Sequence, residues 1–148
     1  RALSLPLARL EVLWKEYETW ELLLNRTLGR QLVAEWADRN RAAGKAGKER
    51  AALRAAAPLD APGRPPHQED AALVRGWHAF LAFELAGPFQ LPDAADQAAR
   101  ATLAFEQALL PLRLHAEAYH AAALSCARAG NPDGAHGYWQ RGASALPS

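Results

Sequence analysis

The stretch GWHAFLAFE, residues 76–84, decides the fold of this chain. It places an aromatic side chain at every third residue, at Trp77, Phe80 and Phe83, and a glutamate, Glu84, directly after the last one. Residues three and seven apart lie on one side of an α-helix, so Trp77, Phe80 and Glu84 share a face and Phe83 lies on its flank. We therefore predict a helix whose wide aromatic surface contacts more than one neighbour.

An earlier stretch, LWKEYETWE at residues 13–21, repeats this pattern with Trp14, Tyr17, Trp20 and Glu21. A helical pattern that recurs within 148 residues indicates a repeat protein. Each large aromatic side chain buries about 150–250 Å², which is worth roughly 4–6 kcal/mol at about 25 cal/mol per Å². We therefore interpret these aromatic residues as core rather than as a stacking platform for nucleic-acid bases.

A second motif marks the partner helix of each pair. FEQA at residues 105–108 recurs as WQRG at residues 139–142, a shift of 34 residues that is typical of tetratricopeptide-like helix pairs. No segment alternates with a period of two residues, so we predict an all-α fold, an α-solenoid of antiparallel helix pairs. The predicted repeat positions are Trp14, Tyr17, Trp20, Glu21, Trp77, Phe80, Phe83, Glu84, Phe105, Glu106, Tyr119, Trp139 and Arg141.

The predicted domain organisation is a single stretch of repeats. Residues 1–148 are interpreted as part of one repeat domain, with a proline-rich loop at 58–67 that contains four prolines. The chain contains no methionine and begins at Arg1 in the middle of a helical pattern, so we expect it to be part of a longer protein. The predicted helix pairs cover about 8–57, 68–111 and 113–146.

Composition narrows the classes of function. A formal net charge of +1 gives no overall field of the kind that marks a nucleic-acid binder. The single cysteine, Cys126, excludes an internal disulfide framework and suits a reducing compartment. No apolar run reaches the about 20 residues that are needed to span a bilayer, so we expect no membrane partner.

Catalytic, cofactor and metal sites are not indicated by any pattern in the chain. His115 and His120 are five residues apart, so they point to different sides of a helix and do not converge on a zinc ion. Cys126 lacks a histidine at a useful helical spacing and is expected to be a small buried thiol. No glycine-rich loop precedes a helix in a phosphate-binding arrangement. We therefore predict a protein that is not an enzyme and that needs no cofactor or metal.

The repeated glutamates are interpreted as structural residues. Glu21 and Glu84 belong to separate repeats, so they do not form a catalytic pair of carboxylates. Burying a carboxylate without a partner costs roughly several kcal/mol. Each glutamate is therefore expected to accept hydrogen bonds from an arginine or from backbone groups. We expect Arg100 to be the partner of Glu84.

The segment 26–54 carries eight basic and three acidic residues. Two interpretations stay open for it: a solvated helix with a Lys45–Glu49 pair, or a docking face for RNA phosphates or an acidic protein surface. Three of its basic residues, Arg41, Lys45 and Lys48, fall on one side of the helix. The candidate docking face comprises these three and the following Arg50 and Arg54.

These pieces resemble a known family. The motifs that contain Trp14 and Trp77 resemble the first helix of a HAT (half-a-TPR) repeat, and FEQAL and WQRGA resemble its second helix. The order of the pieces along the chain is more specific than any single HAT motif. That order is LWKEYETWELLLN, the long basic helix, the proline-rich gap and FEQALL. This order is similar to the N-terminal HAT region of the Suf-domain family, the HAT-repeat scaffold subunits of cleavage stimulation factor.

The resemblance implies a nuclear, non-catalytic scaffold in pre-mRNA 3′-end cleavage and polyadenylation, with other subunits of that machinery as partners. In this family a second HAT region forms a homodimer and a C-terminal segment recruits further subunits. Homodimerisation is therefore expected of the longer protein through regions outside this chain. Two alternatives are a HAT-repeat splicing factor scaffold and a direct RNA-binding module that uses the basic helix 26–54.

Overall fold

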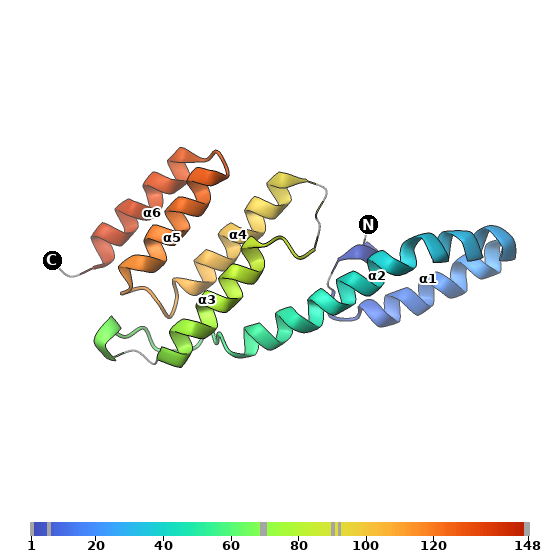
Figure 1. Ribbon diagram of the computed structural model, residues 1–148, viewed down its shortest axis with the longest axis horizontal. Coiled ribbons are helices and arrows are strands. Elements are labelled where there is room, and N and C mark those ends of the chain that lie inside the picture. Colours follow the sequence, from blue (N-terminus) through green and yellow to red (C-terminus); the bar gives the residue numbers. More distant parts are fainter. Residues whose placement is uncertain (1, 6, 69–70, 90, 92, 147–148) are drawn as a thin grey trace. The chain divides into compact units, whose positions relative to one another are not determined.

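The computed structural model describes residues 2–5, 7–68, 71–89, 91 and 93–146. In that part of the chain we find α-helices, two short 3-10 helices and no strand, which confirms the predicted all-α fold (Figure 1). None of the described helices is both long and apolar enough to cross a membrane. The elements are η1 (Ala2–Ser4), α1 (Leu10–Leu24), α2 (Arg26–Ala55), η2 (Pro66–Gln68), α3 (Ala71–Leu85), α4 (Ala94–Ala108), α5 (Ala116–Arg128) and α6 (Pro132–Ala145).

The chain divides into two compact units, Arg1–Ala52 and Leu53–Ser148. The division falls inside α2, so the last residues of this long helix belong to the second unit. There Leu53 packs against the core that α3 and α4 help to form. The far end of the long basic helix thus packs on a different set of residues from its beginning.

The first unit is a hairpin of α1 and α2. Asn25 joins the two helices and caps the second, because its Oδ1 accepts hydrogen bonds from the backbone N–H groups of Thr27 (3.0 Å) and Leu28 (3.1 Å). The helices approach each other closely at Gly29, where a Cβ atom would lie 2.5 Å from the carbonyl oxygen of Glu21. Only glycine leaves room for this approach of two backbones.

The aromatic residues of α1 are less buried than we expected. Trp14 and Tyr17 are half-buried, and their ring centroids are 5.7 Å apart. Trp20 is 57% exposed, so the prediction that it belongs to a core is wrong. It lies about a third of a turn away from Trp14, on a flank that no described element of this unit covers.

The second unit has a continuous hydrophobic core built by α3, α4, α5 and α6. Trp77 and Phe80 are fully buried, as predicted, and their rings meet edge to face at 5.8 Å. Phe83 is half-buried and packs against Phe89 at 5.9 Å. Cys126 is a free, buried thiol, as predicted. Further core residues are Leu81, Ala104, Phe105, Ala108, Leu109, Leu112, Tyr119, Ala122, Ala123 and Tyr138.

Individual residues mark where α3 ends and where α4 begins. Gly87 has φ +65°, a conformation that favours glycine, and it lies just after the end of α3. The N-cap of α4 is Asp93, whose side chain accepts a hydrogen bond from the backbone N–H of Ala95 at 2.8 Å. The sequence predicts that the acidic residues Glu69 and Asp70 begin one helix and that Pro92 lies in the first turn of the next, but these positions lie outside the described residues.

Candidate functional site

Glu84 and Arg100 join α3 to α4. The Glu84 side chain is 2% exposed, and Arg100 Nη2 donates a hydrogen bond to its Oε2 at 2.9 Å. The Arg100 guanidinium also lies 4.3 Å from the centroid of the Phe89 ring. Gln97 donates from Nε2 to the backbone carbonyl of Glu84 at 2.7 Å. The expected pairing of Glu84 with Arg100 is confirmed, and its geometry is that of a structural tie between consecutive helices.

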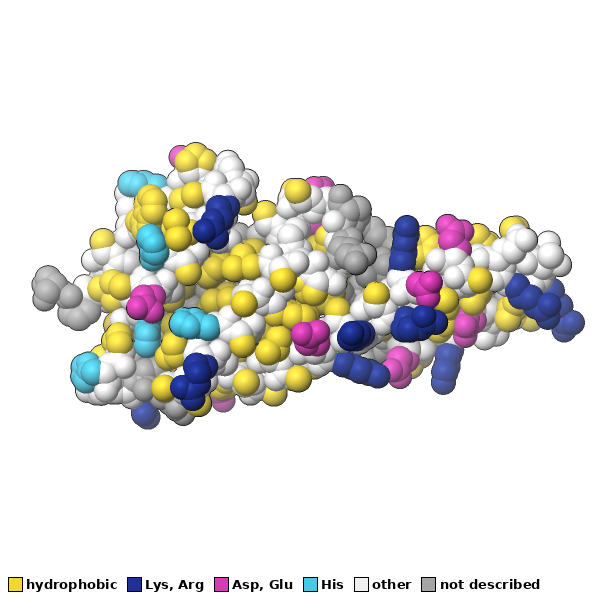
Figure 2. All heavy atoms as spheres, viewed as in Figure 1, with side chains coloured by type: hydrophobic (Ala, Val, Ile, Leu, Met, Phe, Trp, Pro, Cys, Tyr) yellow, Lys and Arg dark blue, Asp and Glu magenta, His cyan; other side chains and the backbone are white. Residues whose placement is uncertain are grey.

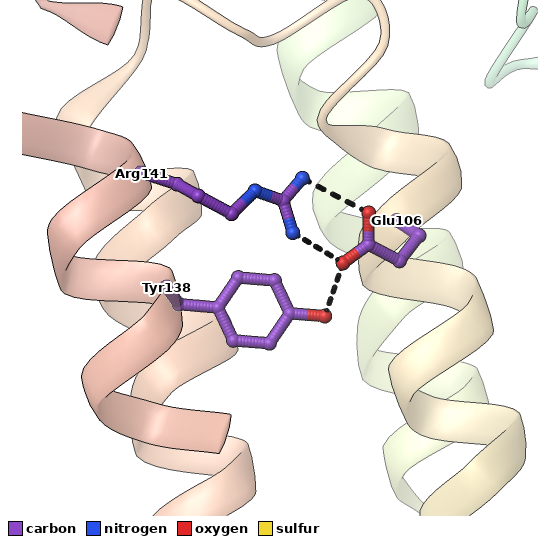
Figure 3. A network of polar contacts seen from close by, with 3 residues as sticks. All are labelled: Glu106, Tyr138 and Arg141. Atoms are coloured by element: carbon purple, nitrogen blue, oxygen red, sulfur yellow. Dashed lines mark hydrogen bonds and ion pairs between the residues drawn. The ribbon is translucent and has the colours of Figure 1, made fainter. Parts of the chain in front are cut away.

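A second network joins α4 to α6 (Figure 3). Arg141 donates to both carboxylate oxygens of Glu106, at 2.6 Å from Nη1 and 3.0 Å from Nη2. The hydroxyl of Tyr138 donates to Oε1 of the same carboxylate at 2.7 Å. Planar, bidentate pairs of this kind have a defined orientation as well as charge attraction.

This contact was not predicted from the sequence, although both motifs were. Glu106 is the second residue of FEQA and Arg141 is the third residue of WQRG, 35 residues later. Aligning the two motifs pairs Glu106 with Gln140, at the second position of each. The contact instead joins the second position of one motif to the third position of the other. The signal that could have found the contact is the opposite charge at neighbouring motif positions.

The network shifts the pKa values of its members. The hydrogen bond from Arg141 holds the pKa of Glu106 below its ordinary value, with a smaller contribution from Tyr138, although partial burial opposes the shift. Burial and the hydrogen bond to Glu106 raise the pKa of Tyr138. Both shifts favour a charged Glu106 and a neutral Tyr138 at neutral pH.

The stability of this network should depend on pH. A carboxyl group with a lowered pKa in the folded state stabilises the fold above its unfolded pKa, about 4.3 for glutamate, and this contribution is lost as the pH falls through the folded value. Glu106 and Arg141 side chains are 42% and 50% exposed, so we expect Glu106→Gln to lower the free energy of unfolding by only about 0.5–1 kcal/mol at pH 7. Urea unfolding at pH 7, 5 and 3 should show the difference from the wild type shrinking below about pH 4.

The matched control is Glu16→Gln in the middle of α1, an exposed residue for which the described part of the chain shows no ion pair. Its effect should be small at every pH. A Glu106→Gln effect of the same size at pH 7 and pH 3 would contradict a role for the charged carboxylate.

Three residues of the candidate basic face, Arg41, Lys45 and Lys48, are exposed on α2, and two of these three lie close to acidic side chains. Arg41 Nη1 lies 2.7 Å from Oδ1 of Asp38, and Lys48 Nζ lies 3.6 Å from Oε1 of Glu11. Lys45 is exposed between them on the continuous helix. Pairs at such exposed positions contribute about 0.2–1 kcal/mol each, so a competing anion can displace them.

Two further members of the candidate face are placed differently. Arg54 belongs to the second unit, where its guanidinium lies 4.8 Å from the Trp77 ring centroid and 5.4 Å from that of Phe80. It also donates to the carbonyl of Ala57. Arg50 is half-buried. We therefore leave both out of the exposed basic face, which is defined from here on as Arg41, Lys45 and Lys48.

The remaining motif residues are structural or exposed. Tyr119 is buried, and its hydroxyl donates to the carbonyl of Arg113 at 3.1 Å. Phe105 is buried, whereas Trp139 at the equivalent motif position is 48% exposed. Among the described residues, no group of three or more His, Cys, Asp or Glu side chains is placed to hold a metal ion.

Comparison with known proteins gives a consistent set of matches. Residues 1–148 match the family described as Suppressor of forked protein (Suf). The chain is 29% identical over 151 residues to the mRNA 3′-end-processing protein RNA14 of Cryptococcus neoformans, covering 99% of this chain and 14% of that protein. It is 30% identical over 150 residues to cleavage stimulation factor subunit 77 of Arabidopsis thaliana, covering 99% of this chain and 20% of that protein. The chain thus spans a fifth or less of these relatives.

A solved structure supports the fold. The crystal structure of CstF-77 superposes with a TM-score of 0.66 at 18% sequence identity, covering 98% of this chain and 30% of that one. At this identity the similarity concerns the helical architecture, and it agrees with the predicted solenoid of helix pairs.

Proposed function

This chain belongs to the Suppressor of forked (Suf) family, and from that premise we propose that it is a segment of a non-catalytic scaffold in nuclear pre-mRNA 3′-end cleavage and polyadenylation. The observation that carries the proposal is the family match over all of residues 1–148. The relatives that support it are an mRNA 3′-end-processing protein and a subunit of cleavage stimulation factor. The splicing-factor alternative has no such support among them.

The fold of the second unit suits a scaffold. Ion pairs from Glu84 to Arg100 and from Glu106 to Arg141 fix α3, α4 and α6 to one another. A surface that is ordered before binding loses less conformational entropy when a partner docks. We propose that residues 1–148 form part of a HAT-repeat domain, with helix pairs at about 8–57, 68–111 and 113–146, that presents such surfaces to other processing subunits. Homodimerisation is proposed for the whole protein, through regions outside this chain.

Affinity purification of the full-length protein from nuclear extract tests this function. We expect cleavage and polyadenylation factors to be recovered, and we expect recovery to fall when the second unit is destabilised by Trp77→Ala. Recovery of splicing factors alone, or of no processing factor, would contradict the proposal.

A second candidate function is direct RNA binding through the exposed basic face. Arg41, Lys45 and Lys48 are exposed on one helix, and their charges are offset locally by Asp38 and Glu11. RNA phosphates would replace these two carboxylates, with release of counterions. The segment is therefore suited to weak binding that depends on salt.

Replacing Arg41, Lys45 and Lys48 together by alanine should flatten the salt dependence of RNA binding. For single strands the slope of log K against log salt is about −0.7 per neutralised phosphate, so removing three contacts should reduce its magnitude by about 2. Fluorescence anisotropy of a labelled single-stranded RNA over a salt series measures this slope. The control replaces Arg9, Arg75 and Arg113, which are also exposed, and changes the net charge equally. Equal slopes for the two triple variants would rule out a specific basic face.

A further inference from the structure

A groove with a volume of ≈ 450 Å³ lies between α4 and α5, within the second unit. Figure 2 shows apolar side chains gathered in the hollow between these two helices. Ala98, Ala101 and Phe105 line it from α4, and Ala121 and Leu124 line it from α5. The volume falls within the range of about 300–1,000 Å³ that is typical of ligand-sized clefts.

Polar groups are found at one end of this groove. Consecutive helices run in opposite directions, so Gln97 near the start of α4 and Arg128 in the last turn of α5 lie at the end remote from their connection. Gln97 Oε1 is buried and has no hydrogen-bond partner among the described residues. Arg128 is exposed, and the described part of the chain offers it no ion pair. The groove therefore has an apolar base and a mouth with one positive charge.

We propose that this groove binds an amphipathic helical segment of a partner protein. The segment would place apolar side chains, three or four residues apart, against Phe105 and Leu124, and an acidic side chain beside Arg128. This inference rests on the proposed scaffold function and names the chemistry of one partner.

The lining of the groove favours a helix over other occupants. Alanines on both walls let another backbone come close, as small residues do where helices cross tightly. Ala98 and Phe105 are seven residues apart on α4, which corresponds to about 10 Å or two turns of a bound helix. A nucleic-acid strand would need several cations to neutralise its phosphates, whereas Arg128 is the one charged residue of the described lining.

Selection of peptides against the chain tests the proposal. The probe is a display library of 16-residue peptides with a helical framework of alanine and glutamine and six randomised positions. We expect enrichment of peptides with large apolar residues at helical spacing and an aspartate or glutamate near one end. A selection that enriches no peptide, or only peptides without an acidic residue, overturns the proposal.

Variants then locate the binding site. Ala121→Trp fills the groove from an exposed helix position and should weaken the selected peptides at least tenfold, as measured by fluorescence anisotropy. Ala127→Trp, on an exposed position of the same helix outside the groove, should leave their affinity unchanged. Unchanged thermal unfolding of both variants shows that the fold is intact. Equal binding by the two variants overturns the assignment of the site.

A charge exchange tests the contact with Arg128. Arg128→Glu should weaken an acidic peptide about fivefold, the upper end for a partly exposed ion pair, and the same peptide with lysine in place of its acid should regain the loss. A merely structural role for Arg128 would weaken both peptides alike and would overturn the pairing. Binding of a labelled 15-nucleotide uridine RNA that Ala121→Trp abolishes would assign the groove to nucleic acid instead.

The two proposals fail separately. If full-length protein recovers processing factors from nuclear extract but no helical peptide is selected, the groove assignment is wrong and the scaffold function stands. If selected peptides bind and Ala121→Trp blocks them, but no processing factor is recovered, the groove assignment stands and the pathway is wrong.

Discussion

Replacement of Trp77 by alanine should lower the free energy of unfolding of the second unit by about 3–5 kcal/mol, as for other large buried aromatic residues. Its side chain is fully buried, meets Phe80 edge to face at 5.8 Å, and is covered by Arg54 at 4.8 Å. Small domains have total stabilities of about 5–15 kcal/mol, so this loss is a large part of the whole. Urea denaturation followed by far-UV circular dichroism measures it.

Two comparisons sharpen this prediction. The indole Nε1 of Trp77 is buried without a hydrogen-bond partner among the described residues, so Trp77→Phe removes an unsatisfied donor and should cost much less than Trp77→Ala. Trp139 in the same unit is 48% exposed, and Trp139→Ala should have a small effect. A Trp77→Ala variant with an almost unchanged unfolding midpoint would show that the core does not depend on this ring.

Removing the arginine from the Glu84–Arg100 pair should be the next most damaging change. Arg100→Ala removes the 2.9 Å contact of Nη2 with Oε2 from a carboxylate whose side chain is only 2% exposed. Breaking a fully buried pair costs about 3–5 kcal/mol, and Arg100 is itself 28% exposed, so we expect about 2–3 kcal/mol. The free energy of unfolding from urea titration at pH 7 measures the effect.

A double variant separates charge from packing. Adding Glu84→Gln to Arg100→Ala removes the buried charge and should restore part of the loss, because the remaining amide is less costly to bury than a carboxylate. Arg75→Ala on α3 is the matched control, since Arg75 is exposed, and its effect should stay within about 0.5 kcal/mol. A double variant less stable than Arg100→Ala would argue against a buried charge as the cause.

Local patterns were sufficient to predict the helices and part of the core. The aromatic spacing around Trp77 predicted a buried helix face, and the cost of burying Glu84 predicted an arginine partner. The same spacing failed for Trp20, which is exposed although its motif resembles that of Trp77. Periodicity reports which residues share a face of one helix, but whether a neighbour covers that face depends on the packing of other helices.

The groove and the α4–α6 network depend on tertiary geometry. Ala98 and Ala121 are unremarkable in the sequence, and they line a groove only because α4 and α5 leave space between them. Glu106 and Arg141 are separated by 35 residues, and the whole of α5 lies between them in the chain. In the sequence, only the opposite charges at neighbouring positions of the two repeated motifs point to this contact.

The bidentate contact of Glu106 with Arg141 also restricts how the length of this chain can vary. One residue added within α6 before Arg141 would turn its side chain by about 100° and shift it by about 1.5 Å, enough to break the contact. The length of the proline-rich loop at 58–67 is not restricted in this way, because the loop lies outside the interval from Glu106 to Arg141. Insertions and deletions between members of the family should therefore concentrate in that loop, while the interval from Glu106 to Arg141 keeps a constant length.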